Sequence, residues 1–226
     1  LLDPFLMLDH FGSENPVDYM AGFPWHPHRG IETVTYMLQG KVEHEDSKGN
    51  KGFIEEGGIQ WMTAGKGILH QEMPKKCDCH LSGIQLWVNL PGKNKLMEPR
   101  YQDITADQVP ELDWKGIKVR VLAGKFAGAI GPVKDIIVKP NFLDLTVPPQ
   151  TEQTIRVPLG HTAFVYVFEG SGYFSTGKEK RVRAGTMAKL VDGDQVYFAS
   201  GSKQLRFIFA SGKPLNEPIE WRGPIV

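Results

Sequence analysis

Frequent glycine and proline, set between short apolar runs, are the feature that most constrains the fold of this chain. The 226 residues include 25 glycines and 16 prolines, well above the roughly 12% of average usage. Proline breaks helices and glycine marks turns, so no stretch remains in which a long helical repeat can develop. The sequence therefore predicts an all-β protein built from many short strands.

Six segments have the composition of strands. Residues 31–38 are rich in β-branched side chains, and residues 84–90 place an alternating set of apolar side chains on one face. Glycine or proline separates the six segments at intervals that suit a sandwich or a barrel. The other four predicted strands are residues 117–122, 142–147, 163–168 and 205–210.

A short internal repeat indicates two copies of one β domain. Residues 36–40 and 166–170 match in register, each running from tyrosine through an apolar strand to a glycine turn. A second apolar strand that ends in glycine follows in each copy, at residues 61–65 in the first and, more loosely, at residues 196–201 in the second. We therefore expect two similar domains in tandem.

The connection between the two copies is predicted at residues 91–99 and in a short helix after Thr105. Thr105 and Gln108 have the spacing of a capping box, and Pro110 limits how far a helix can extend. We place the boundary near residue 112, which gives domains 1–112 and 113–226.

Composition argues against several classes of protein. Lys plus Arg and Asp plus Glu each number 26, so the formal net charge is zero, and the cations are scattered. This gives no attraction to nucleic acid or to an anionic membrane. No apolar run approaches the roughly 20 residues of a membrane span, and no signal peptide is evident, so a cytoplasmic location is expected.

Cys77 and Cys79 are predicted to be reduced thiols, since their spacing fits neither a disulfide framework nor a zinc knuckle.

Two pairs of polar side chains in the first copy predict a metal site. His26 and His28 lie on the same side of an extended chain because side chains alternate along a strand. His70 and Glu72 repeat this arrangement after a glycine turn. If the two strands are neighbours, all four side chains converge on one point. Three neutral imidazoles and a carboxylate suit one divalent first-row transition metal and leave positions open for a substrate or dioxygen.

The second copy is predicted to hold no metal. The repeat places Arg156 at the position of His26 and Pro158 at that of His28. Around the counterpart of His70, residues 202–206 contain no histidine or carboxylate.

Several segments together resemble the pirin family of the cupin superfamily, over nearly the whole chain. They are residues 2–12, 23–36, 60–74 and 86–90, with Phe-Pro-Trp-His-Pro-His-Arg-Gly and Gly-Lys-Gly-Ile-Leu-His-Gln-Glu as their cores. The resemblance implies a bicupin, with two antiparallel jelly-roll β-barrels face to face and a few short helices. It also implies one metal in the N-terminal barrel, commonly Fe(II), with Mn, Ni, Co, Cu or Zn also compatible.

The resemblance carries the ligand roles onto His26, His28, His70 and Glu72. The general cupin pattern would instead take its carboxylate four residues after the second histidine, at Glu32. Along a strand, Glu32 would lie some 13 Å beyond His28 at about 3.3 Å per residue. We therefore prefer Glu72.

The resemblance further implies a metal-dependent dioxygenase that cleaves quercetin-like flavonols, so the expected partners are a small aromatic substrate and dioxygen. Glu72 is the expected catalytic base, and Trp25 and Met62 are expected to line the substrate site. The alternative is a regulatory protein that binds transcription factors or metabolic enzymes through a charged ring of Arg29, Glu32 and Lys66. A storage or structural metal protein is a third interpretation.

Other polar and aromatic side chains have simpler interpretations. Trp61, Trp87, Phe164 and Phe168 are expected in the core. His10, His44, His80 and His161 are expected in loops or at strand edges.

Overall fold

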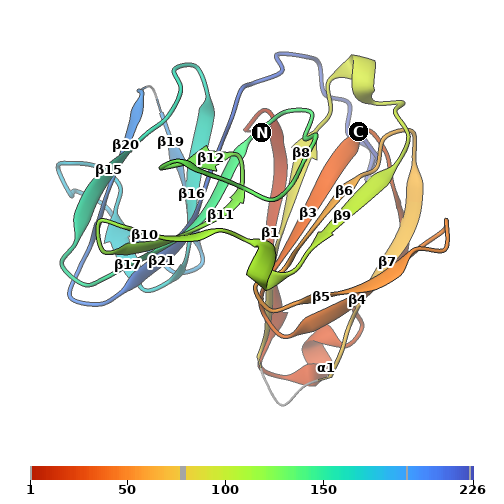
Figure 1. The fold of residues 1–226 in the computed structure, drawn as a ribbon, viewed down its shortest axis with the longest axis horizontal. Helices are drawn as coiled ribbons and strands as arrows, with labels where there is room; N and C mark the ends of the chain where they lie inside the picture. The colour runs from red at the N-terminus through yellow and green to blue at the C-terminus, as the bar shows by residue number, and fades with distance from the viewer. Residues whose placement is uncertain (1, 77–79, 192, 224) are drawn as a thin grey trace. The chain divides into compact units, whose positions relative to one another are not determined.

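The computed structural model describes residues 2–76, 80–191, 193–223 and 225–226. The described chain consists mainly of antiparallel strands with one short α-helix, which confirms the all-β prediction (Figure 1). Within these ranges no helix is long and apolar enough to span a membrane. Cys77 and Cys79, and with them the prediction of reduced thiols, lie outside the described residues.

The chain divides into two compact units. One contains Asp3–Gln108 together with Leu215–Val226, and the other contains Val109–Pro214. The final segment therefore groups with the first unit. The division into a metal-binding domain 1–112 and a metal-free domain 113–226 stays a prediction.

The first unit contains two sheets (Figure 1). Buried side chains of the two sheets form hydrogen bonds with each other in the interior of the unit. One sheet has the order β1-β8-β3-β6-β9 and the other has the order β2-β7-β4-β5. A short helix, α1 (Pro16–Tyr19), follows β1, and Asn15 caps its first turn. The strands are β1 (Phe5–Ser13), β2 (Phe23–His28), β3 (Ile31–Gln39), β4 (Lys41–Asp46), β5 (Lys51–Glu55), β6 (Ile59–Thr63), β7 (Ile68–Pro74), β8 (Leu81–Asn89) and β9 (Arg100–Ile104).

The second unit repeats this design with a larger first sheet. Its sheets have the orders β10-β11-β14-β21-β16-β19 and β15-β20-β17-β18. The first sheet is formed by β10 (Glu111–Trp114), β11 (Ile117–Ala123), β14 (Asn141–Val147), β16 (Thr162–Glu169), β19 (Thr186–Leu190) and β21 (Leu205–Gly212). The others are β15 (Glu152–Arg156), β17 (Ser171–Tyr173), β18 (Arg181–Arg183), β20 (Gln195–Ser200) and a small pair, β12 (Lys125–Phe126) with β13 (Ala129–Ile130).

The strand orders confirm the internal repeat. The order β1-β8-β3-β6 in the first unit corresponds to β14-β21-β16-β19 in the second, and β2-β7-β4-β5 corresponds to β15-β20-β17-β18. The looser match of residues 61–65 with 196–201 is wrong, because β6 corresponds to β19 and β20 corresponds to β7. An apolar strand that ends near a glycine occurs at several places in each barrel, so composition alone paired the wrong strands.

All six predicted strands are present, as β3, β8, β11, β14, β16 and β21. The predicted short helix is a single 3₁₀ turn, Ala106–Gln108, beside a second such turn at Gly92–Asn94. The Gln108 side chain accepts hydrogen bonds from the Thr105 N–H at 2.9 Å and from its hydroxyl at 3.1 Å. The capping side chain is therefore in place, and the segment ends after one turn.

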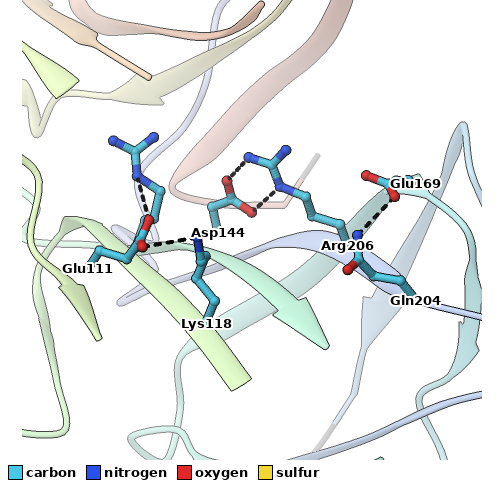
Figure 2. Close-up of polar contacts among 7 residues, drawn as sticks. Glu111, Lys118, Asp144, Glu169, Gln204 and Arg206 are labelled. Atoms are coloured by element: carbon cyan, nitrogen blue, oxygen red, sulfur yellow. Dashed lines mark hydrogen bonds and ion pairs between the residues drawn. The ribbon is translucent and has the colours of Figure 1, made fainter. Parts of the chain in front are cut away.

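The second unit has an apolar interior and a charged patch on the other face of its larger sheet (Figure 2). Asp144 on β14 is buried and accepts two hydrogen bonds from Arg206 on the neighbouring strand β21, at 2.6 and 3.1 Å. The guanidinium also lies 4.9 Å from the centre of the Phe168 ring. Glu111 forms an ion pair with Lys118 nearby, at 3.1 Å.

We expect Arg206→Met to lower the free energy of unfolding by about 3 kcal/mol, because it leaves the buried carboxylate of Asp144 without its cation. The matched control is Lys178→Met, because Lys178 pairs with Glu152 where both side chains are exposed. That change is expected to cost at most about 1 kcal/mol. Urea unfolding measures both. Equal losses in the two variants would contradict a structural role for the pair of Asp144 and Arg206.

Candidate metal centre

Three imidazoles converge inside the first barrel. The antiparallel strands β2 and β7 place His26 directly opposite His70, and His28 follows two residues along β2. The Nε2 atoms of His26 and His28 are 3.0 Å apart. The three rings each offer one nitrogen, and these atoms lie within 4.8 Å of one another. The predicted convergence of these three histidines is therefore present.

A glycine turn places β7 beside β2. Gly65 has a φ of 52°, in the left-handed region that favours glycine. A Cβ atom at Gly65 would lie 2.0 Å from the carbonyl oxygen of Met97, so a larger residue cannot fit without moving the backbone. The carbonyl of Gly65 also accepts a hydrogen bond from the N–H of Gly30, directly after β2. This contact ties the turn to the strand that carries the first two histidines.

The imidazoles have nitrogen atoms available for a cation. The Nδ1–H of His26 donates to the carbonyl of Pro24 at 2.7 Å, so in the neutral ring Nε2 carries the lone pair. His70 is buried, and neither of its nitrogens has a hydrogen-bond partner among the described residues. Burial, and then the neighbouring His26 and His28, lower the pKa of His70 to about 2. His70 is therefore neutral at physiological pH.

These features fit a divalent transition metal. A buried imidazole without a hydrogen-bond partner is costly, and a cation at the meeting point of the three rings would satisfy it. The backbone hydrogen bond of His26 is also the arrangement that commonly fixes the ring of a metal-ligating histidine. The three-histidine group can therefore hold a metal ion.

Glu72 lies in the same interior but is not part of the three-histidine group. Its carboxylate accepts hydrogen bonds from the Thr35 hydroxyl at 2.8 Å and from the Gln85 amide at 2.7 Å. Burial raises the pKa of Glu72, while these two hydrogen bonds oppose the rise. Its ligand and base roles stay predictions.

Known proteins match both halves of the chain. Residues 1–88 match the family described as Pirin, and residues 142–226 match the Pirin C-terminal cupin domain. A protein of Pseudomonas aeruginosa is 45% identical, over 99% of this chain and 80% of that protein. The chain belongs to the pirin family.

The similar proteins carry different names. The Pseudomonas aeruginosa protein is named "putative quercetin 2,3-dioxygenase". A protein of Arabidopsis thaliana named pirin-like is also 45% identical, over 99% of this chain and 74% of that protein. A crystal structure of quercetin 2,3-dioxygenase from Acinetobacter baumannii is 38% identical, with a TM-score of 0.89, and the match covers 99% of this chain and 80% of that one. This pirin therefore has the bicupin fold that the sequence predicts.

Glu32 of this pirin faces away from the imidazoles. Alternation along β3 places Glu32 on the opposite face from Thr35, whose hydroxyl reaches Glu72. Glu32 is fully buried and accepts a hydrogen bond from the Thr63 hydroxyl at 2.7 Å. The predicted charged ring of Arg29, Glu32 and Lys66 is therefore wrong, because the Glu32 side chain does not reach solvent.

The predicted substrate residues differ in exposure. Trp25 precedes His26 on β2 and is 49% exposed. Met62 on β6 is fully buried in a cluster that includes Ile31, Ile68 and Trp87. Their substrate contacts stay predictions.

The interpretation of His44 as a loop or strand-edge residue is wrong. His44 is buried in β4, an inner strand, and lies opposite Glu72 on β7. Its Nε2 lies 3.4 Å from a carboxylate oxygen of Asp103. Val42, His44 and Asp46 alternate as the buried positions of β4, and this alternation is the sequence signal that would have identified His44 as internal. The other three histidines agree with the prediction, since His10 lies on edge strand β1 and His80 and His161 lie in loops.

The second barrel has apolar side chains where the first has its polar set. The glycine turns before β4 and β17 align the two copies. In this alignment, the pairing of β17 with β20 places Val196 at the position that His70 has in the pairing of β4 with β7. The cross-strand partner of Val196 is Ile155, which corresponds to His26. Two residues further along each strand, Val157 corresponds to His28 and Phe198 corresponds to Glu72. All four apolar side chains lie in the buried core of the second unit. These side chains offer no ligand atom.

The assignments of Arg156 and Pro158 as the second-copy counterparts are wrong. Both are one residue past the corresponding positions, because the connections between strands differ in length in the two copies and a constant offset does not hold.

We expect His70→Ala and Glu72→Ala to abolish tight metal binding while the barrel stays folded. In each variant the loss of metal affinity should exceed the roughly 10- to 100-fold weakening that is typical when a residue that hydrogen-bonds to a ligand is changed. Metal content after desalting measures the loss, and circular dichroism checks the fold. Full metal occupancy in either variant would remove that residue from the ligand set.

Glu32→Gln is the control, since Glu32 faces the other side of β3. We expect it to retain the metal.

Burial raises the pKa of Glu32 above 4.5. The hydrogen bond from Thr63, the Trp61 indole and the charge of Arg100 oppose this rise. Ionising it therefore reduces stability as pH rises from about 4.5 toward the folded-state value. Glu32→Gln should be more stable than wild type at pH 7, and the difference should vanish near pH 4.

Proposed function

We propose that this pirin is a metal-dependent dioxygenase that cleaves quercetin-like flavonols. The observation that carries the proposal is the convergence of His26, His28 and His70, whose ligand nitrogen atoms lie within 4.8 Å of one another. His28 and His70 are buried, and His26 is half-buried. The names of the relatives from Pseudomonas aeruginosa and Acinetobacter baumannii supply the substrate class, a small aromatic molecule that reacts with dioxygen. We assign the fourth ligand position to Glu72, which lies in the same interior.

The donor set suits one divalent ion, with Fe(II) as our first assignment and Mn, Ni, Co, Cu or Zn also compatible. When bound, the metal would supply Lewis acidity and a path for electrons to dioxygen. His26, His28 and His70 would hold it through neutral nitrogens. The protein contributes the fixed positions of these rings and a buried setting that limits access of water.

Glu72 is the group that we assign to take the proton of the flavonol hydroxyl. A general base must lie within hydrogen-bond reach of the proton that it removes and must have a pKa near the working pH. Burial moves the pKa of Glu72 upward, in the favourable direction. Trp25, exposed beside His26, and Met62, buried on β6, are assigned to the substrate site.

We expect protein with one bound metal to consume oxygen when quercetin is added under air, and the flavonol absorption to disappear with it. Removing the metal with a chelator should abolish both signals, and adding it back should restore them. An oxygen electrode and an absorption spectrometer make the measurement.

Protein that retains one metal and consumes no oxygen with quercetin would contradict the dioxygenase proposal. The regulatory alternative would then be tested by metal-dependent capture of a transcription factor or a metabolic enzyme. Metal-dependent capture without turnover would support that alternative.

A further inference from the structure

Buried hydrogen bonds from the opposite sheet hold both oxygens of Glu72. Thr35 on β3 donates to Oε1 at 2.8 Å, and Gln85 on β8 donates to Oε2 at 2.7 Å. The Gln85 amide also lies 3.4 Å from the Thr35 hydroxyl, which closes a ring of three side chains. All three side chains are buried. The carboxylate is therefore held in one orientation by groups on two strands outside its own sheet.

Trp87 determines which end of the Gln85 amide faces Glu72. The indole N–H of Trp87 donates to Oε1 of Gln85 at 3.0 Å. An indole nitrogen can only donate, so the oxygen of the amide must face Trp87 and its NH₂ group must face Glu72. Reversing the amide would place two donors together at one end and two acceptors at the other. The indole therefore fixes a donor toward the carboxylate.

The same indole packs against an imidazole of the three-histidine group. The Trp87 ring meets the His28 ring edge to face, with their centres 4.9 Å apart. One side chain thus contacts His28 directly and reaches Glu72 through Gln85. The order of contacts is His28, Trp87, Gln85, Glu72 and Thr35.

We propose that Gln85, oriented by Trp87, and Thr35 are positioning residues that fix the Glu72 carboxylate for metal binding. The proposal rests on the proposed function, because it takes Glu72 as the fourth ligand. The physical reason is orientation. A carboxylate held on both oxygens keeps its plane fixed when a cation approaches, whereas a free one must be ordered as it binds.

A second buried glutamine provides the matched comparison. Gln60 on β6 is buried in the same unit and donates to the carboxylate of Asp103 at 2.9 Å. It therefore makes the same kind of hydrogen bond as Gln85, but to Asp103, a carboxylate to which we assign no ligand role.

Cobalt(II) binding tests the proposal without reference to turnover. Titration of metal-free protein gives the affinity, and the visible spectrum of bound cobalt reports its coordination. We expect Gln85→Leu to weaken cobalt binding by about 10- to 100-fold and to change the spectrum. Gln60→Leu should leave both within about 2-fold of wild type, since Asp103 is not a ligand. Circular dichroism and a thermal melt verify that each variant is folded.

Trp87→Phe is the second variant, since it keeps a ring against His28 and removes only the indole N–H. We expect a smaller loss of cobalt affinity than in Gln85→Leu, with a spectral change in the same direction. This variant keeps the proposal testable if Gln85→Leu does not fold.

The outcomes separate the two proposals. Wild-type protein that binds no cobalt would overturn the proposed metal function itself. If wild type binds one cobalt and Gln85→Leu equals Gln60→Leu in affinity and spectrum, the positioning role is wrong and the metal site stands. Tighter binding by Gln85→Leu would also overturn the positioning role, because it would mean that Gln85 holds Glu72 away from the metal.

Discussion

The register between β2 and β7 is the constraint on which the site depends. It places His26 opposite His70, and His28 then points to the same side by the alternation of a strand. A slip of one residue would turn His70 and Glu72 to the outer face and replace them with Leu69 and Gln71. The glycine turn at Gly65 and its hydrogen bond to Gly30 fix this register from one end.

Comparison of the two barrels shows how the first barrel accommodates its buried polar side chains. They share strand order, yet the second fills the corresponding positions with valine, isoleucine and phenylalanine in one continuous core. The first barrel instead buries His44, Glu72, Gln60 and Gln85, whose polar atoms lose contact with water. Hydrogen bonds between the two sheets offset this loss, as from Thr35 and Gln85 to Glu72. The same interactions that make a polar interior tolerable also orient the carboxylate.

Much of this arrangement could be predicted from local sequence. Glycine and proline delimited the strands, and two-residue spacing identified His26, His28 and His70. The donors to Glu72 could not be predicted, because Thr35 and Gln85 come from strands paired only in the tertiary structure. The alternation of Val42, His44 and Asp46 along β4 is sufficient to place His44 inside the barrel. The predicted counterparts of His26 and His28 in the second barrel are one residue too far along the chain, because loop lengths differ between the two copies. Periodicity within a strand gives no information on loop length.

We propose that His26, His28 and His70 bind one metal ion together. X-ray absorption spectroscopy at the metal edge of the loaded protein tests it most directly, because scattering from imidazole rings counts the histidines. We expect three imidazole nitrogens at about 2.0–2.1 Å together with oxygen ligands. We expect two imidazoles in the His70→Ala variant if any metal remains. A wild-type spectrum with fewer than three imidazoles, or one unchanged by His70→Ala, would contradict the account.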